Sequence, residues 1–161
     1  MGSKMTAQAA ALVVALGTMY AAVAQTAVAE QTITRAGSQP ATAGPEQFFT
    51  GLAMVQPVFA PTAEADWSAG YVTFDPGARS AWHTHPAGQR LIVTAGVGRT
   101  AVWGGPVVEI RAGDSLWCPP GVKHWHGAAP GSSMTHLALT LQKAGTNVQW
   151  LEKVSDEQYG R

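Results

Sequence analysis

Short apolar or alternating runs, each closed by turn residues, fill most of the second half of the chain. Runs at 67–74, 91–103, 107–110 and 134–142 are bounded by glycine, proline and aspartate. Such punctuation at spacings of about ten residues is typical of all-β barrels and sandwiches. No segment keeps the apolar period of about 3.6 residues that an amphipathic helix shows over several turns. The pattern predicts an all-β fold in which 91–103 forms two strands around Gly96–Gly98.

The first 29 residues differ in composition from the rest of the chain. Lys4 precedes an apolar run that ends near Ala24, and small-residue motifs suited to cleavage stand at Ala22–Ala24 and Ala27–Ala29. This layout is that of a secretory signal peptide, so we expect residues 1–29 to be removed and residues 30–161 to form a single domain. A membrane anchor is the alternative, although the run is shorter than the roughly 20 apolar residues of a span. We therefore expect an exported protein located in the periplasm.

Charge and cysteine content narrow the possible functions. Ten Lys and Arg residues balance ten Asp and Glu residues, so nothing indicates binding to nucleic acid or to an anionic membrane surface. Cys118 is the only cysteine in the sequence, which excludes an internal disulfide and a thiolate zinc cluster. We expect Cys118 to be a buried apolar residue rather than a nucleophile.

The histidines form a pattern that favours a metal site. All five lie after residue 82, and four of them form two His-X-His pairs, His83 with His85 and His124 with His126. Residues i and i+2 of an extended segment face the same side, so both members of a pair can point into a barrel. Buried polar groups without partners cost a few kcal/mol each, and a divalent ion bound by neutral imidazoles satisfies several of them together. Ordinary surface or hydrogen-bonded histidines are the alternative.

Two segments carry a family resemblance. The segment 77–96 resembles the first cupin motif, G-x5-H-x-H-x3-E-x6-G, with glutamine in place of glutamate. The segment 113–128 resembles the second motif, G-x5-P-x-G-x2-H-x3-N, with Ala128 where asparagine is common. The resemblance implies a double-stranded β-helix (jelly-roll) barrel that holds one divalent metal ion. The ligands that it implies are His83, His85, Gln89 and His124.

A narrower resemblance covers nearly all of the chain after the N-terminal segment. From 33 to 161 the sequence is similar to the small manganese-dependent cupin hydroxynitrile lyases, which also carry glutamine at the fourth ligand position. That likeness implies cleavage and formation of aromatic cyanohydrins such as mandelonitrile, with manganese as the metal. It also implies a pocket bordered by Gly70, Val72 and Thr140 and lined by His126 and His136, the two histidines outside the implied ligand set and hence the candidate catalytic groups. This sequence differs from those enzymes in its N-terminal export signal, which they lack.

The glutamine bears on the chemistry of the centre. Three neutral histidines and a neutral amide leave a divalent site at about +2, whereas a carboxylate would lower that charge to about +1. The higher charge favours Lewis-acid or acid–base chemistry over redox cycling. Mn, Fe, Co, Ni and Zn all suit these donors, and spacing alone does not choose among them. Gln89 could instead hydrogen-bond to a ligand and leave a three-histidine site.

Three functions follow as hypotheses. The first is a hydroxynitrile lyase-like enzyme in which His126 or His136 moves the proton. The second is a metal-dependent dioxygenase that acts on an aromatic or enol substrate, and the third is a non-enzymatic exported protein that binds a metal or small ligand. All three involve a small molecule.

The tryptophans suggest contacts outside the barrel. Trp82, Trp117 and Trp125 are out of phase with the histidine and proline positions, so we expect them to pack on the outer face, where a subunit interface could lie. Cupins often associate, and a homo-oligomer, either a dimer or a tetramer, is expected. The C-terminal segment predicts one helical turn with Ser155 as its cap.

Overall fold

The computed structural model describes residues 30–160, and those from Ile33 onward form one compact unit. The predicted signal peptide, residues 1–29, lies outside the described residues. The described part contains twelve strands and one short helix. In chain order these are β1 (Thr42–Ala43), β2 (Phe49–Thr50), β3 (Ala53–Phe59), β4 (Trp67–Phe74), β5 (Arg79–Ser80), β6 (His83–Thr84), β7 (Gln89–Val102), β8 (Val108–Arg111), β9 (Ser115–Cys118), β10 (His124–Ala128), β11 (Met134–Leu141), β12 (Gln149–Trp150) and α1 (Asp156–Tyr159).

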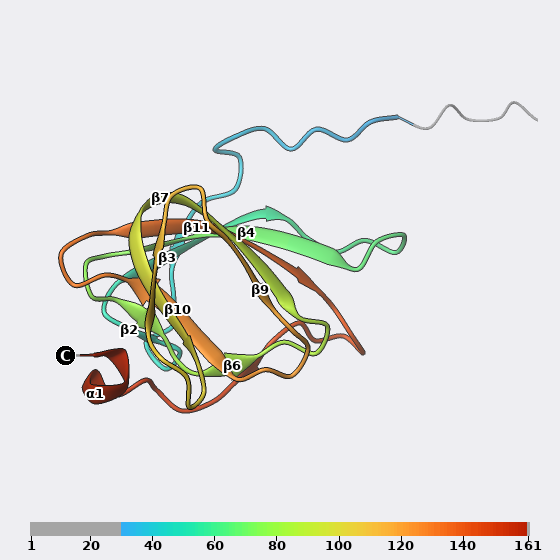
Figure 1. Cartoon of the computed structure of the whole chain (residues 1–161). Coiled ribbons are helices and arrows are strands. Elements are labelled where there is room, and N and C mark those ends of the chain that lie inside the picture. Colours follow the sequence, from blue (N-terminus) through green and yellow to red (C-terminus); the bar gives the residue numbers. More distant parts are fainter. Residues whose placement is uncertain (1–29, 161) are drawn as a thin grey trace, which may run out of the picture. The chain divides into compact units, whose positions relative to one another are not determined.

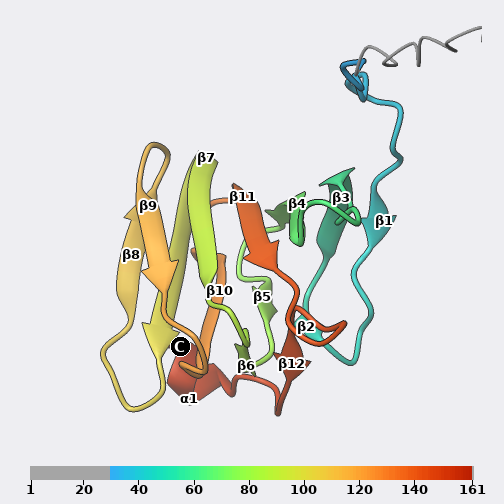
Figure 2. The same cartoon turned by 90° about the vertical axis from the view of Figure 1, so that its right-hand side faces the viewer.

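The strands pair antiparallel and curve round a common axis, which gives a jelly-roll barrel (Figure 1). Hydrogen-bonded neighbours follow the order β1-β3-β4-β11-β7-β10-β5-β2. Strands β8 and β9 add to opposite halves of β7, and β6 joins β10 to β12. Figure 2 shows β7, β11, β4, β3 and β1 side by side when the barrel is viewed at right angles. The prediction of an all-β jelly-roll barrel is confirmed. Within residues 30–160, no helix has the length and apolar character required to cross a membrane.

The long strand β7 corrects one prediction. Residues 91–103 were expected to form two strands around Gly96–Gly98, but β7 runs without a break from Gln89 to Val102. Its first half pairs with β11 and β9, and its second half pairs with β10 and β8. A register shift in its pairing with β11 lies between Val93 and Ala95, and Gly96 just beyond the shift has φ of 75°. A Cβ there would lie 1.9 Å from the carbonyl oxygen of Ser133, so glycine permits a bend in place of a turn.

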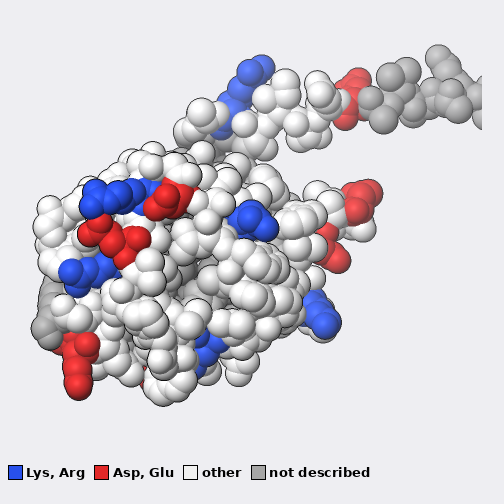
Figure 3. Space-filling model, in the orientation of Figure 1, with Lys and Arg blue, Asp and Glu red and all other residues white. Residues whose placement is uncertain are grey.

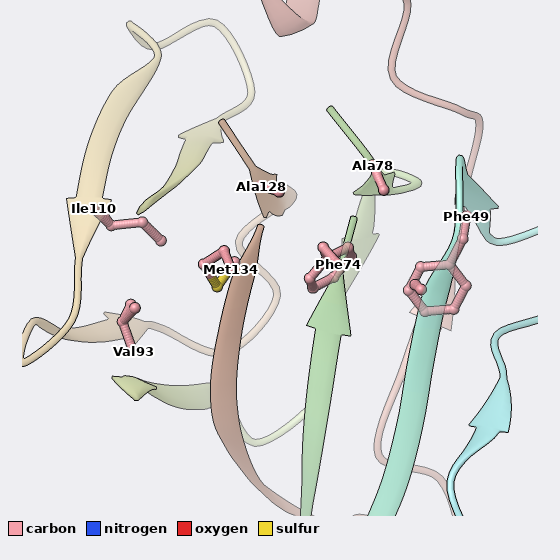
Figure 4. Close-up of a cluster of buried hydrophobic side chains, with 8 residues drawn as sticks. Phe49, Phe74, Ala78, Val93, Ile110, Ala128 and Met134 are labelled. Atoms are coloured by element: carbon pink, nitrogen blue, oxygen red, sulfur yellow. The ribbon is translucent and has the colours of Figure 1, made fainter. Parts of the chain in front are cut away.

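The main hydrophobic core fills one end of the barrel. Phe74, Val93, Ile110 and Met134 come from four different strands and are each at most 4% exposed. Figure 4 shows their side chains together with Phe49, Ala78 and Ala128. On β4, β7 and β11 alternate residues face inward, so that the positions just beyond the core on each strand also point into the barrel. Those positions carry most of the candidate site.

A second apolar cluster lies outside the barrel and changes the interpretation of two tryptophans. Trp82 and Trp125 do point away from the barrel interior, but Val154 and Tyr159 of the C-terminal segment bury them. The Tyr159 hydroxyl donates to the carbonyl of Ala128 at 2.7 Å. Their burial therefore comes from this chain itself and requires no subunit interface. Trp117 is half exposed.

The C-terminal segment is fixed by the predicted helical turn. Ser155 caps α1, and its side chain accepts a hydrogen bond from the backbone N–H of Gln158. The Gln158 side chain accepts in return from the backbone N–H of Ser155, which completes a capping box. This turn places Tyr159 over the outer cluster.

Candidate metal centre

Three histidines and one glutamine converge inside the barrel. His83 begins β6 and His124 begins β10, and the two residues face each other across an antiparallel pair. His85 follows β6, and Gln89 is the first residue of β7. One nitrogen from each of His83, His85 and His124 lies within 4.8 Å of the others, and all four side chains are buried. The structure thus brings together the four residues that the resemblance implied as ligands.

Backbone carbonyls fix the orientation of all three imidazole rings. Nδ1 of His83 lies 2.9 Å from the carbonyl of Ala81, and Nδ1 of His124 lies 2.9 Å from the carbonyl of Val122. Nδ1 of His85 is hydrogen-bonded to the carbonyl of Asn147. Because a carbonyl only accepts, each Nδ1 carries the proton and each Nε2 presents a lone pair.

The contact between His124 and Gln89 supports a metal ion. Nε2 of His124 lies 3.0 Å from Oε1 of Gln89, although both atoms are acceptors once Nδ1 holds the proton. Two ligand atoms at right angles, each about 2.1 Å from an ion, are about 3.0 Å apart, so this spacing matches shared coordination. Within residues 30–160, Nε2 of His85 is also buried without a hydrogen-bond partner. The residues present therefore fit a divalent ion.

Burial keeps these histidines neutral. It lowers the pKa of His83 and of His124, and lowers the pKa of His85 to about 4, since the charged imidazolium loses its hydration. The proximity of His124 lowers the pKa of His83 further. Neutral imidazole is the form that binds a metal, so the centre is ready to coordinate one at neutral pH.

His126 and His136 form a pair beside the centre. Nε2 of His136 lies 3.1 Å from Nδ1 of His126, and the His126 ring centroid is 5.0 Å from that of His83. Phe74 packs against both members of the pair, with centroids 6.0 and 5.7 Å away. Burial lowers the pKa of both, that of His136 to about 3, and the proximity of His136 lowers the pKa of His126 further. Both rings are therefore neutral at pH 7.

The tautomers of this pair are linked. In one arrangement His136 donates to His126, and in the other His126 donates to His136. Either way, the outer nitrogens offer one N–H donor and one lone pair. Nε2 of His126 has no hydrogen-bond partner within residues 30–160, and Nδ1 of His136 has none on another described residue. The pair can therefore accept a proton at one end and release one at the other.

A cavity of about 610 Å³ opens from these groups. His83, His85, Gln89, His126 and His136 lie on its polar wall. Its apolar wall is made by side chains of β2 to β4, β11, β12 and the adjoining loops. These are Phe48, Phe49, Val55, Pro57, Phe59, Val72, Ala138, Val148 and Trp150. Among the described residues, no Asp, Glu, Lys or Arg lines the cavity. The molecular face in Figure 3 is mostly uncharged as well, with basic and acidic side chains intermingled. The cavity suits a neutral, partly aromatic molecule.

The predicted pocket residues all border this cavity. Gly70 and Val72 lie on the inward face of β4, and Thr140 pairs with Gln89 across β11 and β7. Sequence reasoning missed Ser68 and Asn147, which bind Thr140 and also line the cavity. Ser68 shares the two-residue period of Gly70 and Val72 and could have been included on that basis. Nothing in the sequence marks Asn147, because its partners are distant along the chain.

Cys118 takes no part in the centre. It is buried on β9 opposite Gln89 in the strand pairing. Burial raises the pKa of its thiol to about 11, which suppresses the reactive thiolate.

Comparison with known proteins agrees with this geometry. Residues 70–140 match the cupin domain family Cupin_2. The chain is 53% identical to an (R)-mandelonitrile lyase from Granulicella tundricola over 129 residues, which cover 80% of this chain and 98% of that protein. A cupin-like protein of known structure from Thermotoga maritima superposes with a TM-score of 0.69 at 37% identity, covering 80% of this chain and 95% of that one. The polyketide cyclase RemF from Streptomyces resistomycificus has the same fold, with a TM-score of 0.64 at 16% identity over 81% of this chain and 91% of that one. The chain therefore belongs to the cupin family.

Proposed function

We propose that this protein is a metal-dependent, hydroxynitrile lyase-like enzyme that cleaves and forms aromatic cyanohydrins such as mandelonitrile. One observation carries the proposal: a three-histidine centre whose fourth donor is an amide faces an uncharged cavity beside a pair of linked neutral histidines. The 53% identity to a mandelonitrile lyase supports the same reaction class.

His83, His85, Gln89 and His124 would hold one divalent ion, with manganese proposed on the family resemblance. When bound, the ion supplies a Lewis acid that stabilises a developing alkoxide or cyanide. Because no anionic side chain of the described residues lines the cavity, the protein leaves the positive charge of the centre uncompensated.

The histidine pair would manage the proton. Cleavage removes the hydroxyl proton, breaks the bond to the nitrile carbon with its electrons leaving on cyanide, and returns a proton to cyanide. A lone pair on one outer nitrogen of His126–His136 accepts the first proton, and the N–H at the other end donates the second. Their low pKa values make them weak bases in isolation, so they act best on a hydroxyl that is already acidified.

The cavity walls would orient the substrate. The small residues Gly70 and Ala138 pair across β4 and β11 at the cavity, and Val72 supplies an apolar surface for an aromatic ring. Trp150 lies 4.9 Å from His83 between centroids and stacks with Phe48 at 4.7 Å, so an aromatic wall stands directly beside the centre. A ring held there places its benzylic carbon toward the histidines.

The test is release of benzaldehyde from racemic mandelonitrile by manganese-loaded protein, with oxygen uptake followed in the same sample. Three results together support the proposal. Benzaldehyde forms well above the spontaneous rate, one enantiomer of mandelonitrile is consumed preferentially, and no oxygen is taken up. Oxygen uptake with an aromatic or enol substrate would instead favour the dioxygenase. Ligand binding with no turnover of any kind would favour a binding protein.

Export to the periplasm and assembly into a dimer or tetramer are further proposals. The first depends on residues 1–29, which have the composition of a signal peptide. The second has some support in the half-exposed Trp67 and Trp117 on the outer face of the barrel.

A further inference from the structure

One of the three imidazole rings is held differently from the other two. His83 and His124 each bind the carbonyl of the residue two positions before them, at Ala81 and Val122. Their orientation is thus set within the same short segment. His85 binds the carbonyl of Asn147, which is 62 residues away in sequence. The orientation of His85 therefore depends on a tertiary contact.

Asn147 belongs to the turn that connects β11 to β12. This turn is closed by an isolated bridge between Lys143 and Thr146. Ala144 and Gly145 adopt φ of 51° and 79° in it, and residues 143–146 are exposed. Such a turn has few packing contacts of its own to fix its position, so it needs anchors to the barrel.

The side chain of Asn147 supplies such an anchor. Its Nδ2 donates to Oγ1 of Thr140 at 3.1 Å, and lies 3.5 Å from Oγ of Ser68. The two hydroxyls are themselves 2.9 Å apart. Thr140 pairs with the ligand residue Gln89 on the neighbouring strand. Asn147 therefore joins the turn, the polar edge of the cavity and one metal-binding imidazole.

We propose that Asn147 is a positioning residue that sets the orientation and tautomer of His85, and thereby the affinity of the centre for its metal ion. Its side-chain amide holds the residue against Thr140 and Ser68, and its backbone carbonyl then receives Nδ1–H of His85. Without the amide, the carbonyl is free to move with the turn and the ring of His85 loses its fixed partner. Groups that orient a metal-bound histidine typically change metal affinity by about 10- to 100-fold. The inference rests on the metal site and does not depend on the lyase reaction.

The test measures manganese binding to the metal-free protein, with free Mn²⁺ followed by electron paramagnetic resonance. Asn147→Ala removes the anchoring amide and keeps the backbone carbonyl. Thr146→Ala is the matched control, because among the described residues the Thr146 hydroxyl donates only to the carbonyl of Val148, within the same turn. We expect Asn147→Ala to weaken Mn²⁺ binding about tenfold, while Thr146→Ala stays within about twofold of the parent protein. A loss below about twofold in Asn147→Ala, or equal losses in both variants, overturns the proposal.

A second pair of variants tests the anchor from the barrel side. Thr140→Val removes the hydroxyl that accepts from Asn147, and Thr140→Ser keeps it. We expect weakened Mn²⁺ binding in Thr140→Val, recovery in Thr140→Ser, and no further loss when Thr140→Val is combined with Asn147→Ala, because both break one link. If the losses of Mn²⁺ affinity add in the double variant, the two residues do not act through their shared hydrogen bond. Thermal unfolding of each metal-free variant shows whether it is folded before titration, and a failed lyase assay would leave this binding test intact.

Discussion

The two ends of the barrel interior are built from the same strands, but one end is a packed apolar core and the other is a cavity lined by histidines. On β11, Met134 packs in the hydrophobic core, whereas His136 and Thr140 on the same inward face border the cavity. On β4, Phe74 closes the core, whereas Val72 two positions earlier lines the cavity. A strand rises about 3.3 Å per residue, so Met134 and Thr140 lie about 20 Å apart along one strand. The core end therefore stabilises the frame, and the cavity end carries costly buried histidines at fixed positions.

Phe74 is where the two ends meet. It is fully buried in the core cluster and also touches the rings of His126 and His136. The histidine pair thus packs against the core, while the candidate metal ligands His83, His85 and Gln89 line the cavity. This arrangement suggests that the chemistry and the stability of the protein can be changed separately.

The largest expected effect is a loss of turnover without loss of metal when the histidine pair is changed. His126→Ala or His136→Ala should lower mandelonitrile turnover by about 10²–10⁴-fold, the range for loss of a general acid or base. The bound manganese should stay at the parent level, because the ion is held by other residues. Metal content measured on the same samples as benzaldehyde release checks both points. Loss of metal together with activity would show that the pair supports the ligands instead of moving protons.

Truncation in the core should have the reverse effect. Met134→Ala removes a fully buried side chain and should cost about 2–5 kcal/mol in the free energy of unfolding. Val72→Ala, on the cavity side, should cost only about 1 kcal/mol, because its side chain already borders open space. Urea unfolding of the metal-free proteins measures both. Equal costs would mean that the cavity end contributes to stability as much as the core.

The charge of the centre can be changed with little change of shape. Gln89→Glu should tighten manganese binding by about tenfold or more through direct attraction, and should lower turnover by reducing Lewis acidity. Gln142→Glu adds the same charge elsewhere on the cavity wall and should change affinity less. Titration with Mn²⁺ and steady-state kinetics compare the two variants. Faster turnover in Gln89→Glu would refute the role assigned to the amide.

The smallest expected effect concerns Cys118. Because burial raises the pKa of this thiol to about 11, only a minute fraction is thiolate at pH 8. Alkylation by iodoacetamide should be slow there and should rise by about tenfold per pH unit until that pKa is approached. Mass spectrometry of the modified protein follows the rate. Rapid labelling of the folded protein at pH 8 would indicate that this side of the barrel opens.

Local sequence patterns were enough to predict most of the frame and the group of histidines. The two-residue period of strands places His83 with His85 and His124 with His126, and the turn residues separate most strands correctly. The alternation along 134–142 gave the inward face of His136, and the resemblance added Gln89 as a ligand and the pocket residues. These predictions depend on short-range geometry or on motif spacing, both of which are visible in the sequence.

What could not be predicted depends on contacts between distant segments. Gly96 looks like a turn residue, but pairing with β11 on one side keeps β7 continuous. Trp125 looks like an interface residue until the C-terminal segment covers it. Asn147 has no recognisable motif, since its role arises only when its turn meets His85 and Thr140.

The most direct test of the account is to measure manganese content and benzaldehyde release together in the parent protein and in His124→Ala. His124 is buried and would supply one ligand nitrogen, and its strand partner His83 would keep its own local carbonyl contact in the variant. We predict one bound manganese ion per chain and enantioselective release in the parent protein. The His124→Ala variant should bind no manganese and release benzaldehyde at the spontaneous rate while remaining folded. Parent-level release by a variant that holds no metal would contradict the proposed mechanism.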